Sequence, residues 1–374
     1  MKHTLGLYFH IPFCLSKCRY CDFCSFPHTE ASLRTRYVEA LIAEIEASAN
    51  NFHAYTVDTV FFGGGTPTLL SADAWRLLTD AVRRHFAVSS DAEWTAEANP
   101  ATADKEKLDV MRKCGINRLS IGMQSANDSE LAVLGRAHRH SDLLRTVKEA
   151  REVGFENINL DLMLGIPLQT KESFAASFAE AMALDPTHLS VYSLQIEEGT
   201  PFFEKRHTLP LPSEEEESAM VEHLLEKTAK SGFMRYEISN YAREGYACRH
   251  NLRYWRMQDY LGFGIAAHSL IGNRRFYNGE DMEAYLASPT GVRCEEELLT
   301  SAEREYETVM LGLRLGEGID ERDFRARFGY GFCEKYGERL SPFIKAGLVA
   351  CTEEKTALTA RGMALSNTIL AEIL

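Results

Sequence analysis

Three cysteines close together near the start of the chain have the spacing best suited to chemistry. Cys14, Cys18 and Cys21 follow the pattern Cys-x3-Cys-x2-Cys. A short loop of this kind can place three thiolates at three corners of a [4Fe–4S] cubane and leave the fourth iron without a protein ligand. An open coordination position is typical of metal centres that bind a substrate, whereas structural sites are closed. The spacing therefore predicts a substrate-binding iron–sulfur cluster.

A zinc site and three free thiols are the alternatives for this loop. Zinc sites commonly combine two Cys-x2-Cys pairs, and the sequence has no distant second pair. Cys24 lies just beyond the loop and would close the open iron if it were a fourth ligand. We expect it to be a buried free thiol, because three ligands already satisfy the motif.

A second set of polar residues is suited to binding a small molecule. Gly63-Gly-Gly-Thr-Pro67 follows a hydrophobic run, and glycines there let backbone N–H and C=O groups approach a ligand. Glu97 and Asp161 can accept hydrogen bonds from hydroxyl groups of a ligand, and Gln124 can serve the same site. Arg136 can pair with a carboxylate. Each of these residues alone is weak evidence, but Gly63, Glu97, Gln124 and Asp161 all lie at or near the ends of predicted strands.

A third set lies far along the chain, in Cys248-Arg-His250-Asn251-Leu-Arg-Tyr254-Trp255. Imidazole is a common axial ligand of haem iron, and aromatic side chains can cover the macrocycle. If the segment binds haem, His250 is the expected ligand and Cys248 is a rival two residues away; for an isolated histidine a structural role is favoured. The alternative is a hydrogen-bonded structural histidine within an aromatic cluster.

The elements that must position these residues alternate regularly. Six short runs rich in β-branched and aromatic residues are separated by stretches of helical period, which predicts right-handed βαβ units and a parallel sheet. Six units fall short of the eight of a closed barrel, so we expect an α/β fold built on a partial, open (β/α)6 barrel. The expected strands are 5–11, 56–62, 93–97, 118–123, 157–163 and 188–195, and the expected helices are 32–49, 72–85, 103–114, 141–153 and 171–184.

The pattern changes after Pro201, and three parts are predicted. Residues 1–205 form the barrel, and residues 206–300 form a linker with the His250 segment and a helix near 215–231. Residues 301–374 form a smaller, mostly helical domain with a hairpin at 348–358, similar to a winged helix. Because the chain is acidic, we expect this last domain to be a packing or partner surface that does not read DNA.

Composition excludes several classes of function. The 374 residues carry a net charge of −13, which argues against nucleic-acid binding. No apolar run is long enough for a membrane helix, and the first residues lack the pattern of a signal peptide, so a cytoplasmic protein is expected. The nine cysteines are an odd number with three in one loop, which favours metal binding over a disulfide framework.

Six segments in order resemble the radical S-adenosylmethionine (SAM) superfamily, and within it the HemN-like branch. The resemblance covers essentially the whole chain. These segments are Tyr8-Phe-His10-Ile-Pro-Phe-Cys14, Gly63-Gly-Gly-Thr-Pro, Glu97-Ala-Asn-Pro, Arg118-Leu-Ser-Ile-Gly-Met-Gln124-Ser, Leu134-Gly-Arg136-x-His138 and Asp161-Leu-x-x-Gly-x-Pro-x-Gln169.

The resemblance implies how the cofactors are held. In the superfamily the open iron chelates SAM, and an electron from the reduced cluster cleaves SAM to a 5′-deoxyadenosyl radical. Residues matching positions that contact the cluster-bound SAM are Tyr8, Gly64 and Glu97, and Tyr20 is a further SAM-binding candidate. Residues matching positions that hold a second SAM in the branch's dehydrogenase are Gly65, Thr66, Gln124, Arg136 and Asp161.

Within the branch, three features resemble HemW-type haem chaperones more than the oxygen-independent coproporphyrinogen III dehydrogenase. The dehydrogenase has a Cys-x-Cys after its third ligand, where this chain has Phe23. It also has a long extension before its cysteine loop, whereas only thirteen residues precede Cys14 here. His250-Asn-x-x-Tyr254-Trp255 matches the chaperone signature. A haem chaperone that delivers haem to apo-haemoproteins is therefore expected.

The alternatives are the dehydrogenase itself and another SAM-dependent enzyme acting on a tetrapyrrole, and whether the protein is an enzyme stays open. The expected cofactors are a [4Fe–4S] cluster, SAM and haem b. The expected partners are haem, an apo-haemoprotein acceptor and a small electron-transfer protein such as flavodoxin or ferredoxin. Two further candidate partners are a membrane surface and a second copy of the chain, each bound weakly.

Overall fold

The structure is a computed structural model, and it describes residues 3–374. Its centre is one twelve-stranded sheet in the order β14-β13-β12-β11-β1-β4-β5-β6-β7-β8-β10-β9. The strands from β11 to β8 in this order are parallel, and the flanking strands are antiparallel. The parallel strands are β1 (His3–Ile11), β4 (Tyr55–Gly64), β5 (Val88–Ala98), β6 (Arg118–Gln124), β7 (Asn157–Leu164), β8 (His188–Ser193) and β11 (Tyr260–Phe263).

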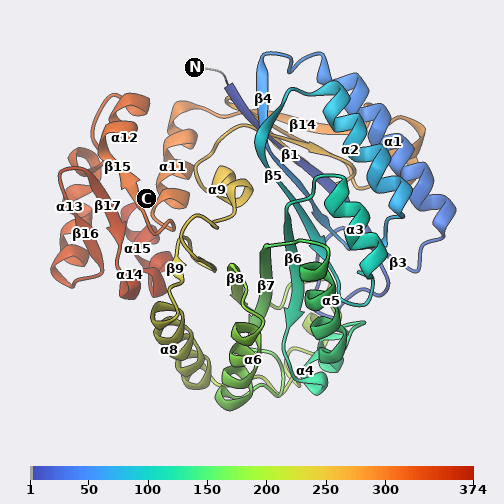
Figure 1. The fold of residues 1–374 in the computed structure, drawn as a ribbon. Helices are drawn as coiled ribbons and strands as arrows, with labels where there is room; N and C mark the ends of the chain where they lie inside the picture. Colours follow the sequence, from blue (N-terminus) through green and yellow to red (C-terminus); the bar gives the residue numbers. More distant parts are fainter. Residues whose placement is uncertain (1–2) are drawn as a thin grey trace.

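Helices cover the outer face of the curved sheet, as Figure 1 shows for α1 to α6. These crossovers give the right-handed βα order that the sequence predicted, so the partial barrel is confirmed. Ser71 caps α2 by accepting from the Ala74 N–H at 3.2 Å. The crossover helices are α1 (Ala31–Ala49), α2 (Ala72–His85), α3 (Lys105–Lys113), α4 (Asp128–Leu134), α5 (His140–Glu152) and α6 (Lys171–Ala183).

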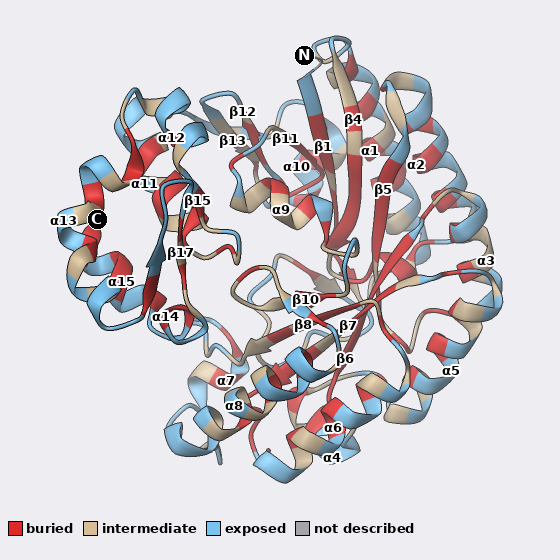
Figure 2. Cartoon of the chain, turned by 60° about the vertical axis from the view of Figure 1, so that its left-hand side comes forward, coloured by how far each residue is buried: buried red, intermediate tan, exposed pale blue. Residues whose placement is uncertain are grey.

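The main core lies between the sheet and these helices. Phe9 in β1 stacks between Phe62 and Phe263, with ring centroids 4.8 and 4.9 Å apart, and Trp75 of α2 meets Phe62 edge-on. In Figure 2 the central strands are buried along most of their length, while the helices are exposed on their outer sides. Alternate residues of each strand therefore face the helices, and the others face the barrel interior.

The span 206–300 differs from the expected linker, because it completes the sheet on both sides. Strand β11 pairs in parallel with β1, and helix α9 (Arg249–Trp255) lies across the interior of the open barrel (Figure 1). The short helix α7 (Pro201–Glu204) precedes this span, and its remaining elements are α8 (Glu214–Lys230), β9 (Met234–Arg235), β10 (Asn240–Ala242), β12 (His268–Ile271), β13 (Arg274–Asn278), α10 (Met282–Ala287) and β14 (Arg293–Leu298).

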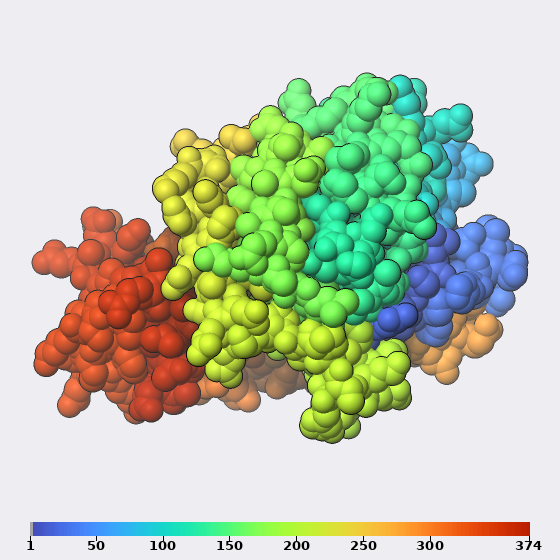
Figure 3. Space-filling model, turned by 90° about the horizontal axis from the view of Figure 1, so that it is seen from below, coloured from blue at the N-terminus to red at the C-terminus, as the bar shows by residue number. Residues whose placement is uncertain are grey.

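The C-terminal part has its own core, centred on Phe324, Phe332 and Leu340. It forms a lobe beside the barrel, seen in red in Figure 3. The predicted hairpin is present, and a third short strand joins it to give the order β15-β17-β16. Its elements are α11 (Ser301–Gly312), β15 (Ile319–Asp320), α12 (Glu321–Phe328), α13 (Phe332–Lys345), β16 (Val349–Cys351), β17 (Lys355–Leu358), α14 (Ala360–Ala364) and α15 (Ser366–Ile373).

Within residues 3–374, no helix combines the length and the apolar character needed to cross a membrane.

Candidate active site and the helix beneath it

The cysteine loop is closed by a short pair of strands directly after β1. Strand β2 (Phe13–Cys14) pairs in parallel with β3 (Phe26–Pro27), which brings the two ends of the loop together. The N–H of Arg19 donates to the Leu134 carbonyl at 2.9 Å and ties the loop to the end of α4. The loop is therefore held at the carboxyl end of the barrel, where parallel βα folds carry their chemistry.

Cys14, Cys18 and Cys21 line a cavity of about 560 Å³, which we call the barrel cavity. The Thr66 hydroxyl donates to the Cys14 sulfur, and the Arg136 guanidinium donates to the Cys18 sulfur, each at 3.7 Å. Such donors stabilise thiolates, so the loop fits a group that takes three thiolate ligands. Cys24 is absent from the cavity lining and packs against the main core instead.

A protonated thiol is a poor metal ligand, and it loses its proton when it binds iron. Burial raises the pKa of Cys14 and raises that of Cys21 to about 11. Within residues 3–374, no three His, Cys, Asp or Glu side chains are gathered closely enough to enclose a single metal ion. Because the raised pKa values keep these thiols protonated, assembly of a cluster on the loop should release protons.

All of the predicted SAM residues except Tyr8 line the barrel cavity together with the three cysteines. The Tyr8 hydroxyl is 3.0 Å from Nδ1 of His10, whose Nε2 is 2.8 Å from the Cys24 carbonyl oxygen. Tyr8 therefore supports the far side of the cysteine loop through His10. The predicted residues in the cavity wall are Tyr20, Gly64, Gly65, Thr66, Glu97, Gln124, Arg136 and Asp161.

Two half-buried carboxyls, Glu97 of β5 and Asp161 of β7, line the barrel cavity. Burial, with Asp161 as the second cause, raises the pKa of Glu97 to about 8, although the Gly64 N–H donates to it at 3.1 Å. Burial also raises the pKa of Asp161, which accepts from Asn159 at 2.6 Å. Both are placed to bond hydroxyl groups of a ligand in the cavity.

Close packing against protein atoms explains the glycine run better than ligand approach does. A Cβ on Gly64, whose φ is +103°, would lie 2.4 Å from the His10 ring. A Cβ on Gly65 would lie 2.8 Å from the backbone oxygens of Ile11 and Phe13. The Gly65 N–H already donates to Ile11. The run thus lets β4 pass close beneath the cysteine loop while Gly64 and Gly65 still line the cavity.

Arg118 is a cavity residue that the sequence reasoning did not single out as a site. Its side chain is 1% exposed and lines the barrel cavity, and no carboxylate of residues 3–374 forms an ion pair with it. Its Nε has no hydrogen-bond partner in the described part of the chain. The residue begins β6, at the end of the strand opposite to Gln124. Its place in the Arg118–Gln124 motif was the available signal.

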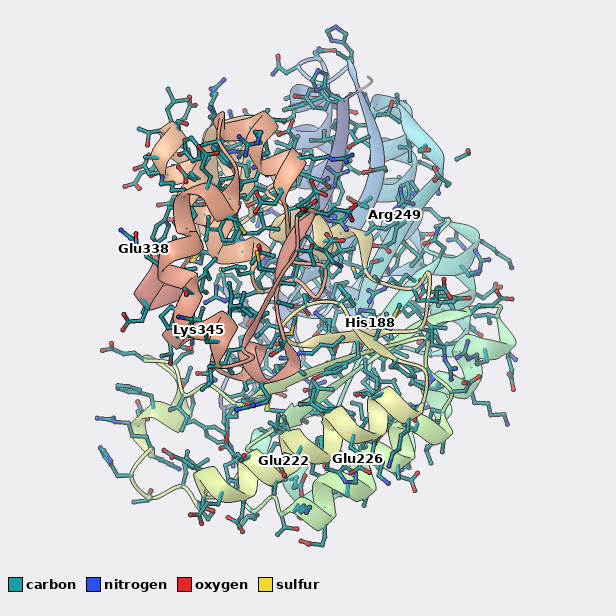
Figure 4. The ribbon with its side chains drawn as sticks, turned by 90° about the vertical axis from the view of Figure 1, so that its left-hand side faces the viewer. His188, Glu222, Glu226, Arg249, Glu338 and Lys345 are labelled. Atoms are coloured by element: carbon teal, nitrogen blue, oxygen red, sulfur yellow. The ribbon has the colours of Figure 1, made fainter. Side chains whose placement is uncertain are left out.

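Helix α9 carries the His250 segment and lies beneath the barrel cavity. Glu93 of β5 caps the helix by accepting from the N–H groups of Arg249 and His250 at 3.0 and 3.1 Å. The buried side chain of Arg253 forms an ion pair with Asp58, which is partly exposed. In Figure 4 Arg249 lies at the start of this helix, on the side of the barrel that faces the C-terminal lobe.

His250 is fully buried, and both of its ring nitrogens are engaged. Nδ1 is 2.9 Å from the Thr59 hydroxyl and Nε2 is 2.8 Å from the Tyr254 hydroxyl, while the ring stacks on Phe61. Burial, with Arg253 next, lowers the pKa of His250 to about 3, so the ring is neutral. Cys248 is also fully buried and points to Glu93. Neither rival ligand presents a free donor atom at a surface.

Three other residues of the segment line a second cavity, of about 480 Å³, which we call the crevice. It lies between the barrel and α11 of the C-terminal lobe. Asn251, Tyr254 and Trp255 form one wall, and Tyr260 and Leu311 contribute to the rest. Asn251 lines the barrel cavity as well, so the two cavities share part of a wall.

Comparison with known proteins identifies the family. Residues 8–181 match the radical SAM superfamily, and residues 299–365 match the HemN C-terminal domain. The heme chaperone HemW of Bacillus subtilis (strain 168) is 36% identical over 373 residues, which cover 98% of each chain. The heme chaperone HemW of Lactococcus lactis subsp. lactis (strain IL1403) is 33% identical over 98% of this chain and 96% of its own. The chain belongs to the HemW family.

The HemW fold is also that of a solved enzyme. The coproporphyrinogen III oxidase HemN from Escherichia coli, described as a radical SAM enzyme, superposes with a TM-score of 0.87 at 26% identity. The match covers 100% of this chain and 90% of HemN. Membership of the radical SAM superfamily implies a [4Fe–4S] cluster and SAM, and the barrel cavity of this HemW chain has the thiols and polar groups to hold them.

Proposed function

We propose that this protein is a haem carrier that passes haem to apo-haemoproteins, with a SAM-bound [4Fe–4S] cluster in the barrel cavity. The observation that carries the proposal is the near-complete coverage at 36% identity of a relative named heme chaperone HemW. The three cysteines would hold the cluster. When bound, the cluster supplies an open iron for SAM and a source of single electrons.

The protein's own residues prepare the barrel cavity for SAM. Glu97 and Asp161 would bond its hydroxyl groups, and Arg136, which donates to the Gly122 carbonyl at 3.0 Å, would face its carboxylate. The side-chain oxygen of Gln124 accepts from the Tyr192 hydroxyl at 3.0 Å, which fixes the orientation of its amide. These contacts bind and orient a ligand in the cavity.

Haem would bind in the crevice. Its wall offers the aromatic faces of Tyr254, Trp255 and Tyr260, and its volume of about 480 Å³ is within the usual range for small-molecule sites. Ligation of the iron by His250 stays a prediction. Such ligation requires the imidazole to break its hydrogen bonds with the Thr59 and Tyr254 hydroxyls and to turn out of the core.

The experiment that tests the carrier function is a transfer assay. The reconstituted protein is loaded with haem, freed of excess haem by gel filtration and mixed with a purified apo-form of a b-type haemoprotein. The Soret band of the acceptor should appear at the expense of that of the carrier. Retention of the haem by the carrier, with no holo-acceptor formed, would contradict the proposal.

Coproporphyrinogen III decarboxylation is the second candidate, and the likeness to HemN favours it. The exposed Phe23, which stands where the dehydrogenase has a further cysteine, argues against it. Anaerobic incubation with coproporphyrinogen III, SAM and a reductant should give no protoporphyrinogen IX, while E. coli HemN gives it under the same conditions. Robust SAM-dependent formation of protoporphyrinogen IX would contradict the carrier function and support the enzymatic one.

A further inference from the structure

Two cysteines of the C-terminal lobe lie in contact, far from the cysteine loop. The sulfur atoms of Cys333 and Cys351 are 2.9 Å apart. Cys333 is in the first turn of α13, and Cys351 is the last residue of β16. Figure 4 shows the same helix farther along, where Glu338 and Lys345 are labelled on the outer side of the lobe.

The surroundings hold both thiols toward one another. The Thr356 side chain of β17 is fully buried, and its hydroxyl is 3.1 Å from the Cys333 sulfur and 3.4 Å from the Cys351 sulfur. The Cys333 N–H donates to Glu321 at 2.8 Å, which fixes the start of α13. Cys351 is exposed, so a small molecule in solution can reach the pair.

This pair differs from the other cysteines outside the cysteine loop. Cys248 is buried against Glu93, and Cys294 donates to the Val292 carbonyl at 3.4 Å. Within residues 3–374, no second pair of cysteine sulfurs is in hydrogen-bonding contact. The contact therefore singles out Cys333 and Cys351.

We propose that Cys333 and Cys351 form a reversible disulfide, and that this modification site takes a low-molecular-weight disulfide of the glutathione type as its oxidant. The Cys351 thiolate attacks one sulfur of the oxidant and releases one thiol, which leaves a mixed disulfide on Cys351. The Cys333 sulfur then loses its proton, attacks the Cys351 sulfur and releases the second thiol. Two protein thiols are oxidised, and one disulfide is reduced to two thiols.

The order of the two steps follows from exposure. Cys351 is the accessible thiol, whereas burial, with the hydrogen bond to Cys351 next, raises the pKa of Cys333 to about 12. Cys333 therefore reacts second, from a position already in contact with its target. The bond ties the start of α13 to the hairpin across an 18-residue separation. Closing that loop should raise the melting temperature of the lobe by several degrees.

Peptide mapping of the full-length, cluster-loaded protein tests this site without any substitution. The protein is incubated anaerobically with oxidised glutathione, unreacted thiols are blocked with N-ethylmaleimide, and the chain is digested with trypsin without reduction. Residues 328–335 and 346–355 are tryptic peptides that each contain one cysteine of the pair. They should be recovered joined, two hydrogens lighter than the sum, and dithiothreitol should separate them.

Matched variants locate the bond. Cys351→Ser should abolish the joined peptides, whereas Cys294→Ser, which removes an isolated thiol of similar burial to Cys333, should leave them unchanged. Recovery of both wild-type peptides as separate N-ethylmaleimide adducts would overturn the proposal. Glutathione retained on Cys351 alone, or linkage of either peptide to another cysteine, would overturn it equally.

Discussion

At the scale of single residues, the barrel cavity brings together two acids and two guanidinium groups. Glu97 and Asp161 face it with Arg118 and Arg136; Arg118 is buried, and the other three are half-buried. Charges in such a site interact more strongly than in water, and an ionised group without a partner is costly. The raised pKa of Glu97 is the measurable sign of this cost.

Glu97→Gln should make the ligand-free protein more stable at alkaline pH. The pKa of Glu97 rises from 4.5 to about 8 on folding, so between these values the native state holds a proton that the unfolded state has lost. Stability therefore falls as pH rises through this window, at a cost of about 1.4 kcal/mol per unit of pKa. Urea unfolding at pH 6 and pH 9 should show that the free energy of unfolding falls less in the variant than in the wild type.

The control for Glu97 is Glu222→Gln, because Glu222 is exposed on α8 (Figure 4). Its pH dependence should equal that of the wild type. An identical loss of stability in wild type and Glu97→Gln would show that Glu97 is ionised in the native cavity at neutral pH.

Cys18→Ala should abolish the cluster, because only two thiols of the loop would then face the barrel cavity. Anaerobically reconstituted wild type should hold about four irons per chain, as a cubane requires. Cys24→Ala should retain them, since Cys24 packs against the core and does not line the cavity. Iron and sulfide analysis with the visible spectrum gives the answer. A full cluster in Cys18→Ala, or its loss in Cys24→Ala, would refute the ligand assignment.

At the scale of elements, α9 is the segment for which the structure differs most from the sequence-based prediction. It is only seven residues long, so its position depends on tertiary contacts rather than on its own stability. Glu93 supplies its cap, Asp58 pairs with Arg253, and Thr59 meets His250. The histidine of the signature thus orders the helix that separates the barrel cavity from the crevice.

Glu93→Ala should loosen α9 and destabilise the protein by roughly 2–4 kcal/mol, because buried N–H groups of the helix lose a charged acceptor. Hydrogen exchange should accelerate at the amides of Arg249 and His250, and urea unfolding should report the loss. Asp91→Ala is the control, since Asp91 lies on the same strand but pairs with Arg249 only at the surface, 3.7 Å away. Equal effects of the two substitutions would show that the cap is unimportant.

The sequence predicted the parallel strands and crossover helices well, because each has a strong local pattern. Helix 72–85 agrees with α2 to the residue, and the six predicted strands all exist. Strand β11 was missed because Tyr-Leu-Gly-Phe is too short to show a period, and its partner β1 lies some 250 residues earlier. The orientation of His250 was equally hidden, since Thr59 is 191 residues away in sequence.

For the candidate site too, residues with a local signal were predicted and residues that depend on distant contacts were missed. Residues at the carboxyl ends of strands, such as Glu97 and Gln124, were found because the topology of βα folds gathers those ends. Arg118 was passed over as a site residue because it begins its strand, and its neighbours Cys248 and Tyr236 come from distant parts of the chain.

At the scale of the whole molecule, two cavities are arranged around one short helix. The barrel cavity opens at the cysteine loop, and the crevice lies between the barrel and the C-terminal lobe, with Asn240 and Asn251 lining both. The side-chain oxygen of Asn240 is buried without a partner in the described chain. These two amides therefore form the wall that the two cavities share.

We propose that haem binds in the crevice, and an anaerobic haem titration followed at the Soret band tests this binding. Wild type should bind one haem per chain with a band distinct from that of free haem. Trp255→Ala should weaken binding about tenfold or more, because a large aromatic face is lost from the wall. Tyr306→Ala, which removes a half-exposed aromatic of α11 outside the crevice, should bind as wild type does. Equal affinities in wild type and Trp255→Ala, or no saturable binding at all, would contradict the account.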